Sequence, residues 1–530
     1  MPGYYHLVPA GQIQPTRRDK IRLDICLQNR LHRSRIYIRE LRFPRETKLG
    51  GHYRVSPRQP LVSGQPSVSE VFPGGGAMNR YQVAVIGSGS AGRAAALLAA
   101  KQGLQTTLIE KDRIGGTAFH NGCYAVTGLL GCARQFRDSQ GSDRFGNEAD
   151  VLKAKLENWQ AAKWSAGTLL AQAFETELKE LHVDFYQGRA HIIADQALEI
   201  ERASGARLTI EADNIVVATG SRPKYAGASH PKLVNSDQLL KMTTCPRRLA
   251  IIGGGHIGCE FASIYRTLGS EVTLIERKSR LLPAWEPDAA RHVTAALQAH
   301  GVVIQLDRDV TPDQILSKGE SVQIMSPDSK VIDADLILFA NGRRPNVESL
   351  RLWELEIDDT SFLEVDTNLR LPRAGMYAIG DVNGISLLDS AAFAQANTVI
   401  QHISGHPLSF DDRWIPRCIH TDPCVAAVGY TEEEAELVDF PCRIASDTMF
   451  LVSDSPRSVI DPEPTFVKVI VDSKYDRLLG CLAAGDHAPT IVNTAAIAIK
   501  AGIKIEDLRQ LGLTQLSATE ALMSVLRKLR

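Results

Sequence analysis

Residues 81–92 read YQVAVIGSGSAG, a short apolar run followed by three closely spaced glycines, Gly87, Gly89 and Gly92. The apolar run predicts a buried strand, and RAAALLAAKQG at 93–103 predicts the helix that follows it. QTTLIE at 105–110 then predicts a second strand, which ends at Glu110. This order of strand, glycine turn, helix, strand and acid is the fingerprint of a dinucleotide-binding fold.

Each residue of the fingerprint has a physical task in such a fold. Gly87 permits the tight turn, Gly89 lets the backbone approach a pyrophosphate, and Gly92 lets the helix pack closely on the strand. The pyrophosphate is expected at the start of the helix, where free N–H groups and the helix dipole attract anions. We expect Glu110 to accept hydrogen bonds from the ribose hydroxyls.

The same unit recurs at 248–276, RLAIIGGGHIGCEFASIYRTLGSEVTLIE, with its glycines at Gly253, Gly255 and Gly258. Its second strand ends at Glu276, a carboxylate that favours the free 2′-hydroxyl of NAD over the 2′-phosphate of NADP. Arg277 and Lys278 follow directly and weaken that preference. Two complete fingerprints in one chain predict two bound dinucleotides and electron transfer between them.

The composition sets limits on function. The chain has 530 residues, 44% of them hydrophobic and 23% charged, as in ordinary globular proteins, and its net charge is -1. That balance argues against a general nucleic-acid or membrane-surface role, and no apolar run reaches the about 18 residues of a membrane span. The nine cysteines include no C-x-x-C pair and no cysteine–histidine spacing typical of zinc, so we expect no metal site and reduced thiols in a cytoplasmic protein.

Seven motifs occur in the order and spacing of a known family: VIGSGSAG (85–92), GGTAFHNGC (115–123), IVVATGSRP (215–223), IIGGGHIG (251–258), LILFANGRRPN (336–346), MYAIGDVNG (376–384) and TDPCVAAVGYTEEEA (421–435). From about Tyr81 to its end, the chain resembles the class I pyridine nucleotide–disulfide oxidoreductases, such as dihydrolipoamide dehydrogenase, glutathione reductase, mercuric reductase and the soluble transhydrogenase. The resemblance implies FAD on the first fingerprint, NAD(P)H on the second, and a homodimer formed by a C-terminal domain.

The resemblance and the strand–helix alternation together predict an α/β fold with two Rossmann-like domains, for FAD and NAD(P), and an α+β dimerisation domain. Residues 1–77 are rich in Arg and Pro, and we expect a disordered extension there, or an upstream stretch before a natural start at Met78. The expected segments are 78–240 and 347–408 for the FAD domain, 241–346 for the NAD(P) domain and 409–530 for the dimerisation domain.

The resemblance also implies the further residues that hold the flavin. Gly115, Gly116 and Thr117 match the pyrophosphate loop, and Asp381 matches the aspartate that binds the ribityl and phosphate region. The turns by which the chain returns between domains match at Thr219, Gly220, Ser221 and Gly342.

The redox loop departs from the family pattern. The family has two cysteines in this loop, and here Ala118 occupies the position of the first, which exchanges with a disulfide substrate. Cys123 occupies the second, which lies against the flavin. Its place at the start of a helix and beside His120, as a possible imidazolium, predicts a lowered thiol pKa.

Three more positions bear on the chemistry. Thr127 replaces a lysine that in the family pairs with a glutamate matching Glu260, so we expect an unpaired buried carboxylate with a raised pKa near the flavin. Near the C-terminus, Gln515 replaces the family's acid–base histidine, and Glu520 keeps the position of the glutamate that orients it. Glutamine cannot shuttle protons, so Ala118 and Gln515 remove the same half-reaction.

The leading hypothesis is an FAD-dependent NAD(P)H oxidoreductase, with NADH favoured, whose acceptor needs no dithiol: a quinone, oxygen, a metal ion or a second nicotinamide. Cys123, Glu260, Gln515 and Glu520 are its candidate catalytic residues. One alternative is a disulfide reductase of the dihydrolipoamide dehydrogenase type that recruits another thiol, although Cys132 is nine residues from Cys123 on one predicted helix. Another is a flavin-bound scaffold or redox sensor without turnover.

Overall fold

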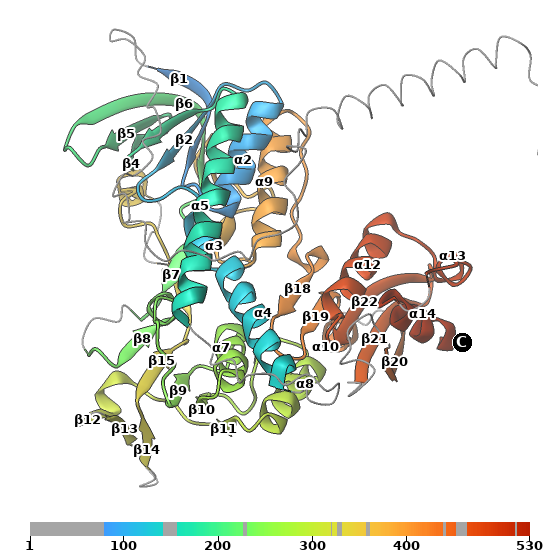
Figure 1. Ribbon diagram of the computed structural model, residues 1–530. Helices are drawn as coiled ribbons and strands as arrows, with labels where there is room; N and C mark the ends of the chain where they lie inside the picture. The colour runs from blue at the N-terminus through green and yellow to red at the C-terminus, as the bar shows by residue number, and fades with distance from the viewer. Residues whose placement is uncertain are drawn as a thin grey trace, which may run out of the picture. The chain divides into compact units, whose positions relative to one another are not determined.

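The computed structural model describes residues 79–140, 156–225, 230–319, 321–325, 331–356, 361–437, 441–451, 464–514 and 517–529. All of them belong to one compact unit, Ser67–Arg530 (Figure 1). The expected N-terminal extension at 1–77 lies outside the described residues.

The first sheet has the order β3-β2-β1-β6-β5-β4, and β17 pairs with β6 beside this path. Its strands β1, β2, β3, β6 and β17 run parallel, whereas β4, β5 and the first part of β6 form an antiparallel meander. The bounds are β1 Arg80–Ile86, β2 Thr106–Glu110, β3 Asp184–Gln187, β4 Arg189–Ala194, β5 Ala197–Glu201, β6 Arg207–Val217 and β17 Met376–Ala378.

Helices α2 (Ser90–Lys101) and α9 (Asp389–Ile403) lie side by side against this sheet, as Figure 1 shows, although almost three hundred residues separate them in the chain. Alanines dominate α2 and are buried along most of its length, which allows the two helices to pack closely. Helices α3 (Gly116–His120), α4 (Cys123–Gln140) and α5 (Leu156–Glu180) follow the second strand. Strand β17 returns to this sheet from the expected segment 347–408.

The glycine turn between β1 and α2 has the geometry that its sequence predicts. Gly87 has a φ of +102°, and a Cβ added to Gly92 would lie 1.8 Å from the carbonyl oxygen of Gly87. No side chain can occupy either position without displacing backbone. The second fingerprint repeats this arrangement, since a Cβ on Gly258 would lie 1.9 Å from the carbonyl oxygen of Gly253.

The second sheet is wholly parallel, with the order β11-β10-β9-β15-β8. Its bounds are β8 Leu233–Asn235, β9 Arg248–Ile252, β10 Glu271–Ile275, β11 Val303–Gln305 and β15 Leu336–Phe339, with helices α6 Ser236–Leu239, α7 His256–Thr267 and α8 Pro287–Ala299. An antiparallel sheet is attached to it, with strands β12 Ile315–Lys318, β13 Ser321–Met325 and β14 Val331–Ala334. Strand β8 pairs in this second sheet, so the segment assigned to the FAD domain up to residue 240 contributes a strand to the other domain.

The C-terminal sheet is antiparallel, with the order β18-β19-β22-β21-β20. Its bounds are β18 Arg417–Ile419, β19 Val425–Gly429, β20 Cys442–Phe450, β21 Pro464–Asp472 and β22 Arg477–Ala484, with helices α10 Glu432–Leu437, α12 Ala488–Ala501, α13 Ile505–Arg509 and α14 Thr519–Lys528. Helices α12 and α14 share one hydrophobic core with β21 and β22. The predicted fold class, two dinucleotide-binding α/β domains and an α+β C-terminal domain, is confirmed.

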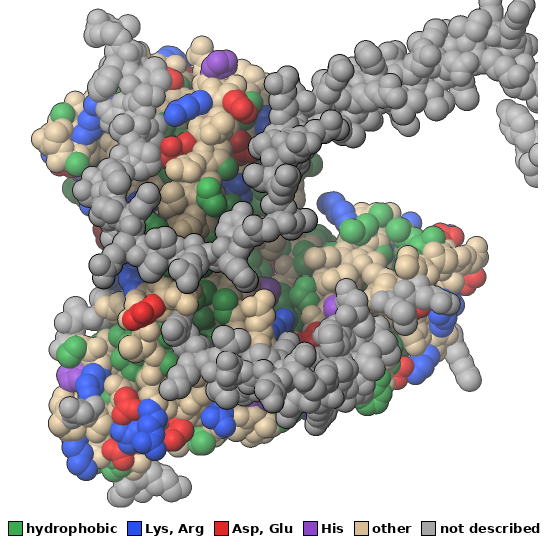
Figure 2. Space-filling view, viewed as in Figure 1, with side chains coloured by type: hydrophobic (Ala, Val, Ile, Leu, Met, Phe, Trp, Pro, Cys, Tyr) green, Lys and Arg blue, Asp and Glu red, His purple; other side chains and the backbone are tan. Residues whose placement is uncertain are grey.

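The distribution of surface charge and the hydropathy of the helices bear on whether the protein binds nucleic acid or a membrane. Basic and acidic side chains intermingle on the face that Figure 2 presents. Within the part of the chain that the structure describes, no helix is both long and apolar enough to cross a membrane.

Candidate active site

The two fingerprint acids occupy equivalent positions and hold their glycine turns in the same way. Oε2 of Glu110 accepts from the backbone N–H of Ser88 at 2.8 Å, and its Oε1 accepts from Asp112 N–H at 2.8 Å. Glu276 accepts at the same relative positions, from Gly254 N–H at 2.6 Å and Lys278 N–H at 2.8 Å. Both carboxylates are buried at the ends of parallel strands, where they fix the glycine turn.

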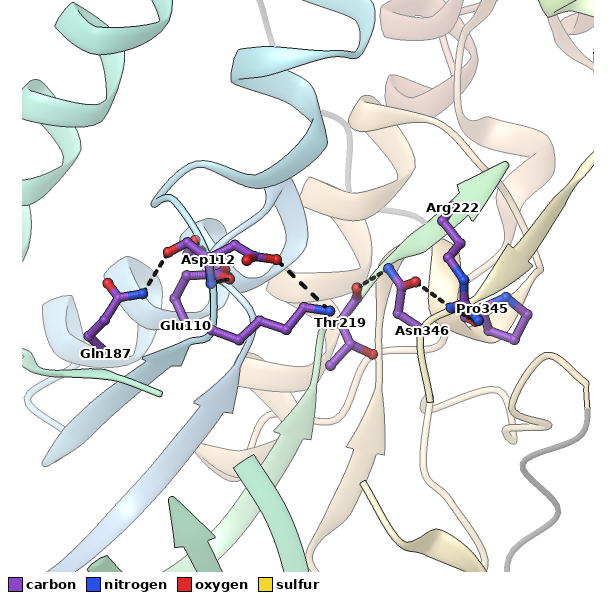
Figure 3. Close-up of polar contacts among 9 residues, drawn as sticks. Glu110, Asp112, Gln187, Thr219, Arg222, Pro345 and Asn346 are labelled. Atoms are coloured by element: carbon purple, nitrogen blue, oxygen red, sulfur yellow. Dashed lines mark hydrogen bonds and ion pairs between the residues drawn. The ribbon is translucent and has the colours of Figure 1, made fainter. Parts of the chain in front are cut away.

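The chain passes twice between the two dinucleotide-binding domains, and polar residues of the two connections are hydrogen-bonded to one another. Figure 3 shows Asn346 donating to the carbonyl oxygen of Thr219, at 2.9 Å, while Arg222 donates to Asn346 Oδ1 at 2.6 Å. Strands β7 (Ser221–Pro223) and β16 (Arg343–Pro345) pair antiparallel at this crossing.

Ser221 links the crossing to Asp381. Its hydroxyl donates to Asp381 Oδ2 at 2.5 Å and accepts from Arg343 Nε at 2.7 Å. The structure brings together the predicted residues Thr219, Gly220, Ser221, Gly342 and Asp381. Arg343 and Asn346 join them although they were not predicted, and both belong to the NGRRPN motif.

The protein leaves room for dinucleotides at both fingerprints. A Cβ added to Gly89, Gly220, Gly255 or Gly342 would meet no protein atom within 4 Å, in contrast to Gly87 and Gly92, which are packed against backbone. In the described part of the chain, the buried hydroxyl of Thr219 has no hydrogen-bond partner. Gly89 and Gly255 are the N-cap residues of helices α2 and α7, and no side chain caps either helix, so their first N–H groups are available to phosphates. These residues fit FAD and NAD(P)H.

The predicted pyrophosphate loop lies against the first glycine turn. The N–H of Gly115 donates to the Ser88 hydroxyl at 3.0 Å, and a Cβ on Gly116 would lie 2.8 Å from the Cα of Gly89. Thr117 is exposed in α3, which begins at Gly116. The loop is therefore in place to cover a pyrophosphate bound at Gly89.

Cys123 begins helix α4 as predicted, but its expected low pKa is wrong. Although the residue is exposed, the atoms around its thiol desolvate it and raise the pKa to about 11, and the carboxylate of Asp389 adds to the shift. His120 does not oppose this effect. Burial lowers its pKa and outweighs the contact of its Nε2 with the carbonyl oxygen of Ile114, at 3.0 Å, which favours the charged form. The net shift disfavours the imidazolium. Cys123 is a thiol in this setting.

Among the described residues, the neighbours of Cys123 offer it no second thiol. Ala118 lies in α3 and packs against the hydrophobic core that β1, α2 and α9 share. The Thr127 hydroxyl donates to the carbonyl oxygen of Cys123 at 2.7 Å. Cys132 lies on the same helix α4, nine residues further, or about 13 Å at 1.5 Å per residue. All eight cysteines of the described residues are free.

Glu260 is buried on α7, and burial raises its pKa, as predicted. The expectation that it has no partner is wrong. Its Oε1 accepts from the backbone N–H of His420 at 2.9 Å, and Ser263, one turn further along α7, accepts from the N–H of Asp422 at 3.1 Å. The missing lysine is thus replaced by backbone of the turn between β18 and β19, a partner 160 residues away that no local pattern announces.

The same turn assembles a group that the sequence analysis missed. Cys418, His420 and Cys424 place their Sγ and imidazole nitrogen atoms within 4.8 Å of one another. In the sequence this group has the spacing C-x-H-x3-C at 418–424, which is shorter than the cysteine–histidine spacings typical of zinc sites.

The predicted C-terminal residues are only partly visible. Gln515 lies outside the described residues, and Glu520 is half-buried in the first turn of α14.

Comparisons with known proteins agree with this geometry. The family model for pyridine nucleotide-disulphide oxidoreductases matches residues 81–399, and the model for their dimerisation domain matches 415–525. Dihydrolipoyl dehydrogenase of Haloferax volcanii is 30% identical over 455 residues (83% of this chain, 94% of that protein), and dihydrolipoyl dehydrogenase of Bacillus subtilis is 28% identical over 436 residues (79% and 91%). The Cu(II) complex of the HOCl-induced flavoprotein disulfide reductase RclA from Escherichia coli matches 85% of this chain and 99% of its own, with a TM-score of 0.73 and 27% identity.

Proposed function

Because the chain belongs to the pyridine nucleotide-disulphide oxidoreductase family and is an FAD-dependent oxidoreductase that uses NAD(P)H, we propose that it oxidises NADH and delivers the electrons to an acceptor that is not a disulfide. FAD, when bound, supplies the hydride acceptor and the store of two electrons. The chain itself supplies the two glycine turns, their acids and the polar crossing at Ser221 and Asp381. The dimerisation domain supports a homodimer.

The observation that carries the proposal is the environment of Cys123. A disulfide substrate needs an attacking thiolate and a second sulfur that resolves the mixed disulfide. Here position 118 is alanine, and the pKa of Cys123 is raised to about 11. The protein around Cys123 therefore stabilises a thiol, whereas dithiol exchange requires a thiolate.

The preference for NADH rests on Glu276. Its buried carboxylate stands at the end of β10, where the resemblance places the adenosine ribose. A carboxylate there accepts from a free 2′-hydroxyl and repels a 2′-phosphate. NADH is therefore the favoured donor.

A quinone, oxygen, a metal ion or a second nicotinamide would each serve as acceptor without a dithiol. Among these, a metal ion has some support from a relative, because RclA from Escherichia coli forms a Cu(II) complex. Two other functions make different predictions. A reductase of the dihydrolipoyl dehydrogenase type, the name of several relatives, would turn over lipoamide, and a scaffold would not be reduced by NADH.

Anaerobic reduction of the purified flavoprotein by NADH tests the proposal, followed by lipoamide, oxidised glutathione, a quinone, oxygen, Cu(II) and NADP in separate reactions. We expect NADH to bleach the flavin, one or more of the non-disulfide acceptors to restore its colour rapidly, and lipoamide and glutathione to fail. Rapid reoxidation by lipoamide would overturn the proposal, and a flavin that NADH leaves oxidised would favour the scaffold.

The double variant Ala118→Cys, Gln515→His is a gain-of-function test, because it restores both residues that the family carries at these positions. We expect it to gain disulfide reductase activity while its reduction by NADH is unchanged. Ala133→Cys, a substitution at a buried position of α4 away from the redox loop, should gain none.

A further inference from the structure

The turn between β18 and β19 gathers three metal-binding side chains on one side of a hairpin. Cys418 pairs with Ala426 and Ile419 with Val425 in the antiparallel register. Since alternate residues of a strand share a face, Cys418 and His420 lie on the same side, and the returning chain brings Cys424 to it.

The donor atoms lie close to the spacing that a single metal ion requires. Sγ of Cys418 lies 3.7 Å from Nδ1 of His420, and all three donor atoms, including Sγ of Cys424, lie within 4.8 Å of one another. Around a tetrahedral ion with metal–sulfur bonds of about 2.3 Å and metal–nitrogen bonds of about 2.0 Å, neighbouring donor atoms are roughly 3.5–3.8 Å apart. Small side-chain rotations would therefore place all three donors on one ion.

Arg134 of helix α4 also reaches this group. Its Nη2 lies 3.3 Å from Sγ of Cys424. A deprotonated sulfur is the form that binds metals, so binding of an ion would release the thiol protons.

The framework of the hairpin is fixed from two sides. Glu260 and Ser263 of helix α7 accept hydrogen bonds from the backbone N–H groups of His420 and Asp422. Helix α4 contributes Arg134, which donates to the carbonyl oxygen of Thr421 at 3.1 Å. Because the backbone that carries the donors is held in place, little ordering entropy would be lost when an ion binds.

Two of the three donors are partly exposed. Cys424 is buried, whereas Cys418 and His420 are half-buried. Among the described residues three protein ligands meet here, so one coordination position remains for water or a small ligand, as in catalytic rather than structural zinc sites.

A second cluster of possible metal ligands among the described residues already contains a cation. The carboxylates of Glu286, Asp288 and Glu432 also lie close together, but the ammonium of Lys468 sits among them, 2.7 Å from Asp288 and 2.9 Å from Glu432. These carboxylates therefore already have cationic partners, since Arg291 also pairs with Asp288. The hairpin donors include two sulfurs and an imidazole, which select Zn²⁺ or Cu⁺ over the hard ions that carboxylates prefer.

We propose that Cys418, His420 and Cys424 form a metal site that binds one thiophilic d¹⁰ cation, Zn²⁺ or Cu⁺, with one coordination position open. Glu260 contacts the site through the backbone N–H of His420, and the proposal does not depend on which acceptor the flavin serves.

The test is an anaerobic titration of the flavin-loaded, fully reduced protein with Zn²⁺, and separately with Cu⁺, against a chromophoric chelator. We expect one equivalent of at least one of the two ions to bind per chain. X-ray absorption of that complex should show two sulfur ligands and one nitrogen ligand.

Variants locate the site. Cys424→Ala and His420→Phe should each weaken binding by more than the about 10- to 100-fold that loss of a supporting partner costs, because each removes a ligand. Cys132→Ser, which removes an exposed thiol of α4, should bind as the unmodified protein does. Retained flavin absorbance shows that each variant is folded.

Three results would overturn the proposal. The first is a reduced wild-type protein that binds neither ion. The second is binding that survives in both ligand variants. The third is conversion of Cys418 and Cys424 into a disulfide during turnover in the presence of either ion, which would assign them a dithiol role instead.

Discussion

The backbone N–H of His420 donates to Oε1 of Glu260 at 2.9 Å and thereby joins the second fingerprint helix to the C-terminal sheet. The carboxyl group is buried, and its pKa is raised by that burial. A backbone N–H satisfies one of its oxygens without supplying a full positive charge. Glu260 therefore differs in its electrostatics from a carboxylate paired with a lysine, the arrangement of the family that the chain resembles.

The first prediction concerns the thiol of Cys123. Because its pKa is raised to about 11, we expect alkylation by iodoacetamide to be slow at pH 7 and to accelerate about tenfold per pH unit up to about pH 10, as the thiolate fraction grows. Mass spectrometry of the peptide that contains Cys123, from flavin-free protein with a retained circular dichroism spectrum, measures the rate. A rate that levels off near neutral pH would show that the thiolate is stabilised after all.

The second prediction compares two glycines of the second fingerprint. In Gly258→Ala the new Cβ would lie 1.9 Å from the carbonyl oxygen of Gly253, so we expect a lower unfolding midpoint and loss of flavin reduction by NADH. In Gly255→Ala the Cβ meets no protein atom within 4 Å, so the fold should be unchanged. The methyl group would instead crowd the bound dinucleotide and weaken its binding by about 1–3 kcal/mol. We therefore expect KM for NADH to rise roughly 5- to 150-fold.

Steady-state kinetics and thermal unfolding of both variants check this difference. Equal loss of stability in the two variants would show that Gly255 is also a packing residue.

The third prediction concerns Lys468, which is buried among the carboxylates of Glu286, Asp288 and Glu432 and joins α8, α10 and β21. Lys468→Met leaves these carboxylates without their cation, and we expect it to lower the free energy of unfolding by about 3–5 kcal/mol. Urea unfolding followed by circular dichroism measures the change. Lys474→Met is the matched control, because this lysine is exposed.

Adding Glu286→Gln to Lys468→Met should recover part of the loss, because it removes one of the buried charges. No recovery would mean that the ammonium acts mainly through packing.

The fourth prediction tests the preference for NADH. Glu276→Gln removes the negative charge but keeps the shape of the side chain, so we expect the ratio of kcat/KM for NADH over NADPH to fall by several-fold, or on the order of 1 kcal/mol. Glu271→Gln, an exposed residue at the start of the same strand, is the control. A ratio that does not change would show that Glu276 does not set the preference.

Both fingerprints could be predicted from the sequence because the reason for each glycine is local. The turn, the first helical residues and the acid 22 residues later form one contiguous unit, so Gly87, Gly92 and Glu110 have the predicted geometry, as do their counterparts at Gly253, Gly258 and Glu276. The same local logic placed Cys123 at the start of a helix.

The tertiary structure alone decided what surrounds these elements. The pKa of Cys123 depends on how many atoms exclude water from its thiol, and the partner of Glu260 comes from a turn 160 residues away. Cys418, His420 and Cys424 acquire a common site only because an antiparallel hairpin turns between them. Desolvation and long-range hydrogen bonds depend on distances in space, whereas sequence patterns record distances along the chain.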